Sequence, residues 1–263
     1  MAQNIKPKLK KFSRYFNDLR GEKANEANTV ARLRHFFEEV LGYDRITEIS
    51  GESEMKGKYV DLCLKVGGNI FMLVEAKAAA VQLRTRQIDQ AKHYASENGY
   101  DWVLLTNGVE WNLYHVSYVE EEGIEYTPAF AVSIADENDL NEAAEKLAIL
   151  HRGAVAKNEL DRFWDRKSAL CAASLGKAIF HENVLRILRR ELRSLCDVLI
   201  DPEDLAVAVH NMFSQEARDE MGPLRIRKSK KRKAKPKPEA ATAAALSATN
   251  GEQEPIRVVT LKT

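Results

Sequence analysis

The sequence predicts an α/β core, in which helices flank a mixed central sheet, followed by a helical subdomain. Two observations support this fold class. From Glu26 onward, apolar residues follow helical spacing, then strand spacing, and then both again within about 95 residues. From Asp139 to about Met221, helical spacing alone continues. A chain of 263 residues can bury such a core without disulfides or structural metals.

The first long helix is the clearest of the predicted elements. Apolar residues recur at helical spacing from Val30 to Leu41 and Gly42 supplies a stop signal, so we expect an amphipathic helix over 26–41. Strand-like segments follow at 45–50, 59–66 and 70–77. A second helix is expected over about 81–98. The segments DWVLLTNG and EWNLYHV then predict a buried strand, an Asn-Gly turn and a further strand.

Composition and pattern divide the chain into four parts. We expect a basic N-terminal segment with one short helix around KFSRYFNDL (1–24), an α/β core (25–118), a mainly helical subdomain (119–221) and a disordered basic tail (222–263). In the helical part, candidate helices lie at 139–151, 157–179, 182–196 and 202–216. Asp201-Pro202 is typical of a helix start, because proline fits the first helical position.

The formal net charge of +1 hides an uneven distribution. Residues 223–263 contain eleven Lys/Arg and three Glu, a net charge of +8, which leaves −7 for the first 222 residues. Nine basic residues and no acidic one lie between Arg225 and Lys237, including Lys230, Lys231, Arg232 and Lys233. This tail either binds phosphates without sequence preference or is a solvated segment without a partner.

Cysteine usage and hydropathy exclude several classes of protein. Cys63, Cys171 and Cys196 are far apart in the sequence and show no metal-ligand spacing, so disulfides and structural zinc are not expected. No segment has the apolar core of a signal peptide or the length of a membrane span. We therefore expect a cytoplasmic protein without a membrane partner.

Three charged residues interrupt the two apolar strands of YVDLCLKVGGNIFMLVEAK. Glu75 and Lys77 share one face of their strand, because side chains alternate. A two-residue Gly67-Gly68 loop would place Asp61 opposite Val74, on the wrong face. A three-residue loop that includes Asn69 would place Asp61 opposite Glu75 and beside Lys77. We expect the second register, although charges paired for solubility on an edge strand would give the same residue types.

Two facing carboxylates in a partly buried site repel each other unless a cation lies between them. Hard oxygen ligands suit Mg²⁺, and Mn²⁺ is an alternative. Such an ion can polarise a phosphoryl oxygen, and Lys77 could orient the attacking water or stabilise developing negative charge. The pattern therefore predicts hydrolysis of a phosphodiester.

Asp61 followed by Glu75-Ala76-Lys77 resembles the PD-(D/E)xK nuclease motif. The likeness is to the N-terminal nuclease domain of type I restriction enzyme R subunits, and it extends to NEANTVARLRHFFEEVLGYD, VEAKA and LLTNGVEWNLYHV. It implies a restriction-endonuclease-like core, with Asp61, Glu75 and Lys77 as catalytic residues and Asp61, Glu75 and Ala76 as metal ligands. The proline of the motif name is absent, since Tyr59-Val60 precedes Asp61.

The resemblance also assigns Gln90 and Tyr94, while helical spacing draws attention to Glu26 and to four arginines. Gln90 and Tyr94 match a Gln-x-x-x-Tyr motif after the catalytic lysine, which implies that Gln90 helps to hold the site or the substrate; otherwise they are an ordinary polar pair on one helix face. Glu26 either contributes to the metal shell or simply places negative charge at a helix N-terminus. Arg186, Arg189, Arg190 and Arg193 form one face of a helix, either a phosphate contact or a solvated surface.

These features predict a magnesium-dependent DNA endonuclease in prokaryotic defence or a mobile element, with DNA and further restriction or defence subunits as partners. The alternative is a catalytically silent DNA-binding or scaffold subunit with the same fold, and an RNA nuclease is a third possibility. R subunits continue into an ATP-driven motor, whereas this chain has no GxxxxGK[ST] phosphate loop. We therefore expect no ATP site and no DNA translocation by this chain alone.

Overall fold

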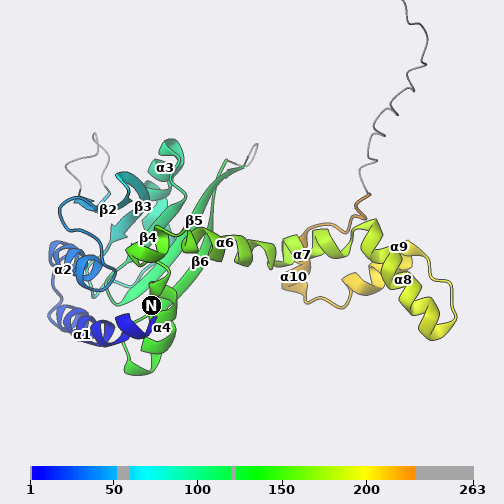
Figure 1. The fold of residues 1–263 in the computed structure, drawn as a ribbon, viewed down its shortest axis with the longest axis horizontal. Helices are drawn as coiled ribbons and strands as arrows, with labels where there is room; N and C mark the ends of the chain where they lie inside the picture. Colours follow the sequence, from blue (N-terminus) through cyan, green and yellow to red (C-terminus); the bar gives the residue numbers. More distant parts are fainter. Residues whose placement is uncertain (1, 52–59, 120–122, 229–263) are drawn as a thin grey trace, which may run out of the picture.

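The computed structural model describes residues 2–51, 60–119 and 123–228 (Figure 1). Its centre is a six-stranded sheet with the strands in sequence order. The strands are β1 (Ile49–Gly51), β2 (Leu62–Val66), β3 (Asn69–Ala76), β4 (Trp102–Thr106), β5 (Glu110–Val119) and β6 (Gly123–Ser133). Only the β3–β4 pair is parallel, and the other neighbouring pairs are antiparallel. This is the mixed sheet expected from the sequence.

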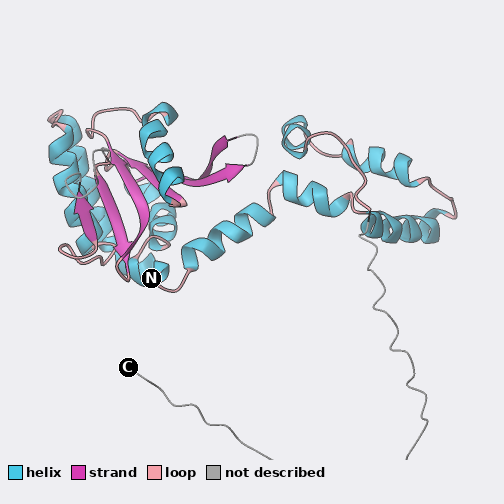
Figure 2. Cartoon of the chain, turned by 90° about the horizontal axis from the view of Figure 1, so that it is seen from above, coloured by secondary structure: helices cyan, strands magenta, loops and turns pink. Residues whose placement is uncertain are grey.

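Helices cover both faces of the sheet, as Figure 2 shows from above. The helices of this α/β part are α1 (Ala2–Gly21), α2 (Glu26–Glu39), α3 (Asp89–Asn98), α4 (Leu140–Ala148) and the short α5 (Arg152–Val155), with 3₁₀ turns η2 (Thr85–Ile88) and η3 (Glu137–Asp139). The alternation of side chains in β2 explains the two layers: Leu62 and Leu64 join the core under α1, α2 and α4, while Cys63 joins the core under α3. Helix α3 is the crossover that a parallel strand pair requires.

The N-terminal segment is a core element, contrary to the expectation of one short helix in a basic extension. Helix α1 has 20 residues, and Ile5, Leu9, Phe12 and Phe16 on one side of it are at most 2% exposed. The lysines between them hid this stripe, because they lower the mean hydropathy without interrupting the helical period. A Cβ at Gly108 would lie 2.1 Å from Phe16, and Gly108 has a φ of +85°, so the Asn-Gly turn before β5 requires glycine.

The sheet also continues beyond the expected core boundary at residue 118. Strand β6 pairs with β5 over Glu110 to Val119, and α4 packs its apolar side into the same core as α1. The sequence GIEYTPAFAVS lacks strict alternation and contains Pro128, so its pattern does not indicate a strand. The α/β part therefore includes the first section of the region expected to be helical.

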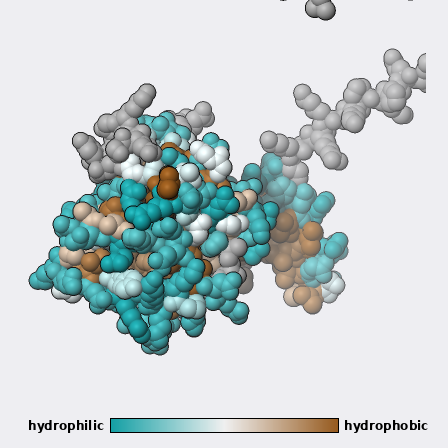
Figure 3. Space-filling view, turned by 60° about the vertical axis from the view of Figure 1, so that its left-hand side comes forward, coloured by the Kyte–Doolittle hydropathy of each residue, from teal (hydrophilic) through white to brown (hydrophobic). Residues whose placement is uncertain are grey.

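A helical lobe follows the α/β part. Helix α6 (Glu159–Ala169) leads into α7 (Ala172–Ile179), α8 (Glu182–Cys196), α9 (Pro202–His210) and α10 (Gln215–Met221), so the helical subdomain is confirmed in outline. The lobe, residues 170–228, has a small core of Phe180, Leu185, Leu205 and Ala206. Apolar side chains gather on its surface in Figure 3. Among the described helices, none is both long and apolar enough to cross a membrane.

Candidate active site

The β2–β3 hairpin sets the position of Asp61 relative to Glu75. Val66 pairs with Asn69, so the loop is the two-residue Gly67-Gly68 and not the expected three-residue loop. The register then shifts by one residue between Leu64 and Lys65, a β-bulge on the β3 side, and Leu62 pairs with Val74. Continued by one residue, this register places Asp61 opposite Glu75, as expected from the sequence. The bulge, rather than the loop length, produces this register.

Asp61 immediately precedes the first residue of β2, and its carboxylate accepts a hydrogen bond from the backbone of β3. The Ala76 amide donates a hydrogen bond to Oδ2 of Asp61 over 2.7 Å. In an antiparallel pair this amide would otherwise meet a carbonyl of the neighbouring strand. This hydrogen bond fixes the Asp61 carboxylate against the C-terminal end of β3.

Glu75 and Lys77 lie side by side at the same strand end. Nζ of Lys77 is 2.6 Å from Oε1 of Glu75 and donates a second hydrogen bond over 2.9 Å to the carbonyl oxygen of Ala76. Glu26, in the first turn of α2, places its Oε2 3.5 Å from the same ammonium group. The side chains of Glu75 and Lys77 are only 11% and 20% exposed, so these two are largely shielded from bulk water, whereas the Glu26 side chain is 46% exposed.

Burial and neighbouring charges together shift the pKa values of Glu75 and Lys77. Burial is the main reason that the pKa of Glu75 is raised above its usual range; the hydrogen bond from Lys77 opposes this shift, and the negative charges of Asp61 and Glu26 add to it. For Lys77, burial acts to lower the pKa, but the hydrogen bond and charge of Glu75, together with Glu26 and Asp61, outweigh it and leave the pKa raised. Lys77 therefore remains an ammonium, and the three carboxylates exceed the one cation.

One backbone hydrogen bond and two buried polar side chains hold the backbone around this cluster. The Lys77 amide bonds to the Thr106 carbonyl over 2.9 Å, and the Ala79 amide donates to Oγ1 of Thr29 over 3.2 Å. Nδ2 of Asn107 donates to the carbonyl of Val81 over 2.9 Å.

Thr29 and Asn107 are 0% and 2% exposed. Sequence reasoning missed both of them as positioning residues. A hydroxyl on the buried stripe of α2 was the available signal for Thr29.

The oxygen atoms at the strand end fit a divalent cation in part. Asp61 and Glu75 offer carboxylates and Ala76 can offer only its carbonyl oxygen, a donor set that suits Mg²⁺, which typically takes one or two carboxylates and completes its shell with water. The acidic side chains around Lys77 outnumber this one cation, which also favours the binding of a further cation. However, no group of three or more His, Cys, Asp and Glu side chains in the described ranges is arranged to hold a metal ion, and the Ala76 carbonyl already accepts from Lys77.

The supporting residues on α3 are only partly described. Gln90 belongs to this helix, but its side chain lies outside the described part of the chain. Tyr94 packs against the core beneath α3, with its ring centroid 6.2 Å from that of Tyr100. These packing contacts do not test a role of Tyr94 with Gln90, which remains a prediction.

The expected arginine face of α8 is not uniform. Arg189 is half-buried, and its Nε donates to the Ile200 carbonyl over 2.7 Å, so it holds the loop that leads to α9. Arg190 pairs with Glu191 and Arg186 donates to Asn183, whereas Arg193 is exposed. Three of the four arginines therefore have partners within the lobe. The other expected phosphate contacts, Lys230, Lys231, Arg232 and Lys233, lie outside the described residues.

Comparison with known proteins gives one finding. No curated protein and no solved structure matches the chain significantly. Residues 33–130 match the family model of the type I restriction enzyme R protein N terminus. This segment contains α2 from Leu33 onward, strands β1 to β5 and most of β6. The match suggests a restriction-enzyme-like nuclease role for the α/β part, which contains Asp61, Glu75 and Lys77.

Proposed function

We propose that this chain hydrolyses phosphodiester bonds of DNA at the cluster formed by Asp61, Glu75 and Lys77. The observation that carries the proposal is the convergence of two carboxylates and an ammonium group at the end of β3, in a segment that matches a restriction enzyme family. Core strands do not need such charges, since burying a charged group costs free energy unless it is paired. DNA is proposed as the substrate because that family belongs to restriction enzymes.

Each residue has a separate task in this proposal. Asp61, Glu75 and the Ala76 carbonyl would hold Mg²⁺ or Mn²⁺. The bound cation supplies Lewis-acid chemistry, which polarises a phosphoryl oxygen and lowers the pKa of water. Lys77 exchanges its contact with Glu75 for the attacking water or the developing negative charge on the phosphate. Glu26 remains beside Lys77 and keeps it protonated.

A second candidate is a silent DNA-binding subunit, and one observation favours it. Lys77 already contacts three oxygen atoms, those of Glu75, Ala76 and Glu26, as it would in an ion-pair network that only stabilises the fold. The two candidates differ in metal binding: a catalytic cluster binds a divalent cation through Asp61 and Glu75, whereas a structural network has no need of one.

The test measures both metal binding and cleavage. Purified protein is titrated with Mn²⁺ in a calorimeter and is incubated with plasmid, linear duplex and single-stranded DNA, with and without Mg²⁺. We expect Mn²⁺ binding and metal-dependent cleavage, both lost in Glu75→Gln and both retained in Glu159→Gln, whose exposed carboxylate on α6 is the control. Mn²⁺ binding that is equal in all three proteins, without cleavage in any, would favour the silent subunit.

A further inference from the structure

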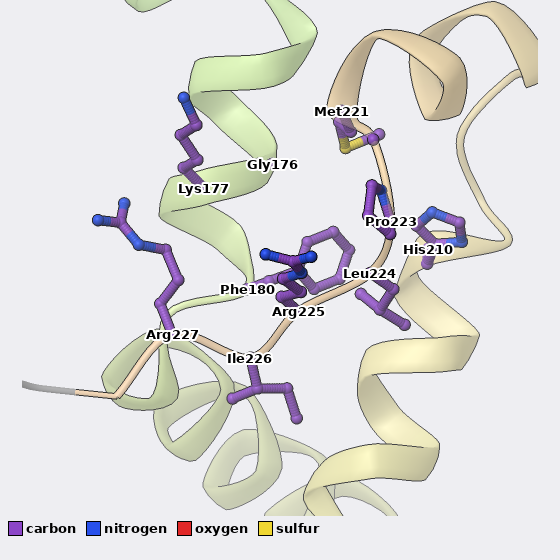
Figure 4. Close-up of a pocket in the computed structure, with 11 residues that line it drawn as sticks. Gly176, Lys177, Phe180, His210, Met221, Pro223, Leu224, Arg225, Ile226 and Arg227 are labelled. Atoms are coloured by element: carbon purple, nitrogen blue, oxygen red, sulfur yellow. The ribbon is translucent and has the colours of Figure 1, made fainter. Parts of the chain in front are cut away.

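The helical lobe contains a pocket far along the chain from the Asp61 cluster. It lies between α7, α9 and α10 and the segment that follows α10, and its volume is about 660 Å³. Figure 4 shows its apolar wall, to which Phe180, Met221 and Leu224 contribute. This volume is in the range of small-molecule sites, about 300–1,000 Å³.

Backbone hydrogen bonds fix the segment that closes the pocket. Arg227 forms a parallel bridge with His181; its amide donates to the Phe180 carbonyl over 3.0 Å, and its carbonyl accepts from the Glu182 amide over 2.9 Å. Leu224 and Ile226 pack against the core of the lobe. Because side chains alternate along an extended segment, Arg225 and Arg227 project away from that core. Figure 4 shows Ile226 pointing away from both arginines.

The charged residues around the pocket are all cations. Lys177 on α7 joins Arg225 and Arg227 among the lining residues, and none of the residues that line the pocket is acidic. No ion pair joins any of these three to a described residue, in contrast to Lys77 and Arg190. Unpaired cations around one opening attract an anion with more than one charged oxygen, such as a phosphate.

One more polar atom of the pocket lacks a partner. Nε2 of His210 is buried and has no hydrogen bond to any described residue. Buried polar atoms normally have a partner, so this nitrogen points to a ligand that can donate or accept a hydrogen bond. The His210 ring lies 6.0 Å from the Phe180 ring, centroid to centroid. The inner part of the pocket is thus aromatic and has one hydrogen-bonding group.

We propose that this pocket binds a nucleotide, with its phosphate at Lys177, Arg225 and Arg227 and its base against Phe180 and His210. Aromatic surfaces combined with cations are the usual means of holding unpaired nucleotides. The ligand is either a free nucleotide or an unpaired nucleotide of a DNA strand. The sequence favours an unpaired nucleotide of a DNA strand, because Arg227 leads directly into Lys228 and the basic run that ends at Lys237. The inference is independent of cleavage, since it concerns binding without metal.

The test uses the full chain in EDTA at fixed salt concentration, so that cleavage does not enter. Fluorescence anisotropy measures binding of a labelled single-stranded oligonucleotide to the wild type, to Arg225→Gln/Arg227→Gln, and to Arg162→Gln/Arg166→Gln. The last variant removes the same charge from exposed positions on α6, outside the pocket. We expect the pocket variant to weaken binding by about tenfold or more, as for the loss of one charge-assisted hydrogen bond. The control variant should change binding less than twofold.

Competitors identify the ligand. If a deoxynucleoside monophosphate displaces the oligonucleotide at low concentration, the ligand is a free nucleotide. If it does not, the ligand is a nucleotide within a DNA strand. The proposal holds in both cases. An oligonucleotide with abasic sites should bind more weakly to the wild type, and this difference should vanish in His210→Leu. Equal binding by the pocket and control variants would overturn the proposal, as would displacement by inorganic phosphate as effective as that by the nucleotide.

Discussion

The α/β part and the helical lobe use their charged residues in opposite ways. In the α/β part, Lys77 is 20% exposed and contacts the oxygens of Glu75, Ala76 and Glu26. In the lobe, Lys177, Arg225 and Arg227 line a pocket, and the side chain of none of them forms an ion pair with a described residue. Charged groups that are fixed by ion pairs and hydrogen bonds are suited to stabilising charge at one reacting atom, whereas exposed cations are suited to attracting a large anion. The comparison is consistent with the two proposals, which place chemistry in the first region and binding in the second.

The two regions also differ in how much apolar surface they bury. Two large clusters enclose the sheet, while the lobe has four buried core residues and leaves Leu195, Leu199 and Met212 at least 76% exposed. Stability increases with buried apolar area, so the lobe should unfold more easily than the sheet. The site at Asp61 therefore rests on a rigid support, and the pocket at Phe180 on a softer one.

The largest effect is expected in the aromatic cluster under the sheet. Phe36 is fully buried, and its ring contacts those of Phe12, Phe16 and Trp111. Phe36→Ala should lower the free energy of unfolding by about 3–5 kcal/mol, because it removes a large side chain and leaves a cavity. Urea denaturation followed by tryptophan fluorescence measures this, and an unchanged midpoint would contradict the rigid core described above.

The second largest effect concerns Lys77. Lys77→Ala should lower the rate of DNA cleavage by about 100-fold or more, because one electrostatic group at the reacting phosphate is lost. DNA binding should persist, since the lobe and tail still provide cations. Lys157→Ala is the control, an exposed lysine outside the candidate active site and the lobe pocket. Single-turnover cleavage and anisotropy are measured on the same samples; parallel losses of binding and cleavage would contradict the division of tasks.

The sequence predicted the layout of the α/β core because its strongest signals are local. The apolar stripe of α2, the Asn-Gly turn and the strand pair around Gly67-Gly68 are each read within a few residues. The cluster of Glu75 and Lys77 followed from strand alternation alone. Asp61 came to the right face through a bulge between Leu64 and Lys65 that no sequence pattern indicated, since bulges depend on tertiary packing.

Other features depended on long-range contacts and could not be predicted. Helix α1 carries many lysines, and its burial is decided by packing on Gly108 and Trp111, about 90 residues further along the chain. The role of Arg189 depends on the Ile200 carbonyl, which only the turn after α8 brings close. The pocket in the lobe required the segment after α10 to pair with His181. None of these pairings leaves a periodic signal in the sequence.

The lobe should unfold separately when its small core is weakened. Leu205→Ala removes one of four buried residues and should cost about 2 kcal/mol, near the lower limit for such changes. The three tryptophans, Trp102, Trp111 and Trp164, lie in the sheet and on α6, and none lies in the lobe. The helical circular dichroism signal should therefore fall at lower urea concentration, while the tryptophan fluorescence transition stays in place. A common shift of both signals would show that the two regions unfold together.

The smallest effect is expected from deleting residues 229–263, which separates the tail from the pocket. The described elements all end before this point, so circular dichroism and the urea midpoint should not change. The deletion removes Lys230, Lys231, Arg232 and Lys233 but retains Arg225 and Arg227. Because each phosphate contact in a single strand contributes about 0.7 to the salt slope, binding should weaken and its dependence on salt should flatten, while the preference for base-containing over abasic strands remains. An unchanged salt slope would mean that the pocket, and not the tail, is the main contact with DNA. Loss of the preference for base-containing strands would mean that the tail also contributes to recognition of the base.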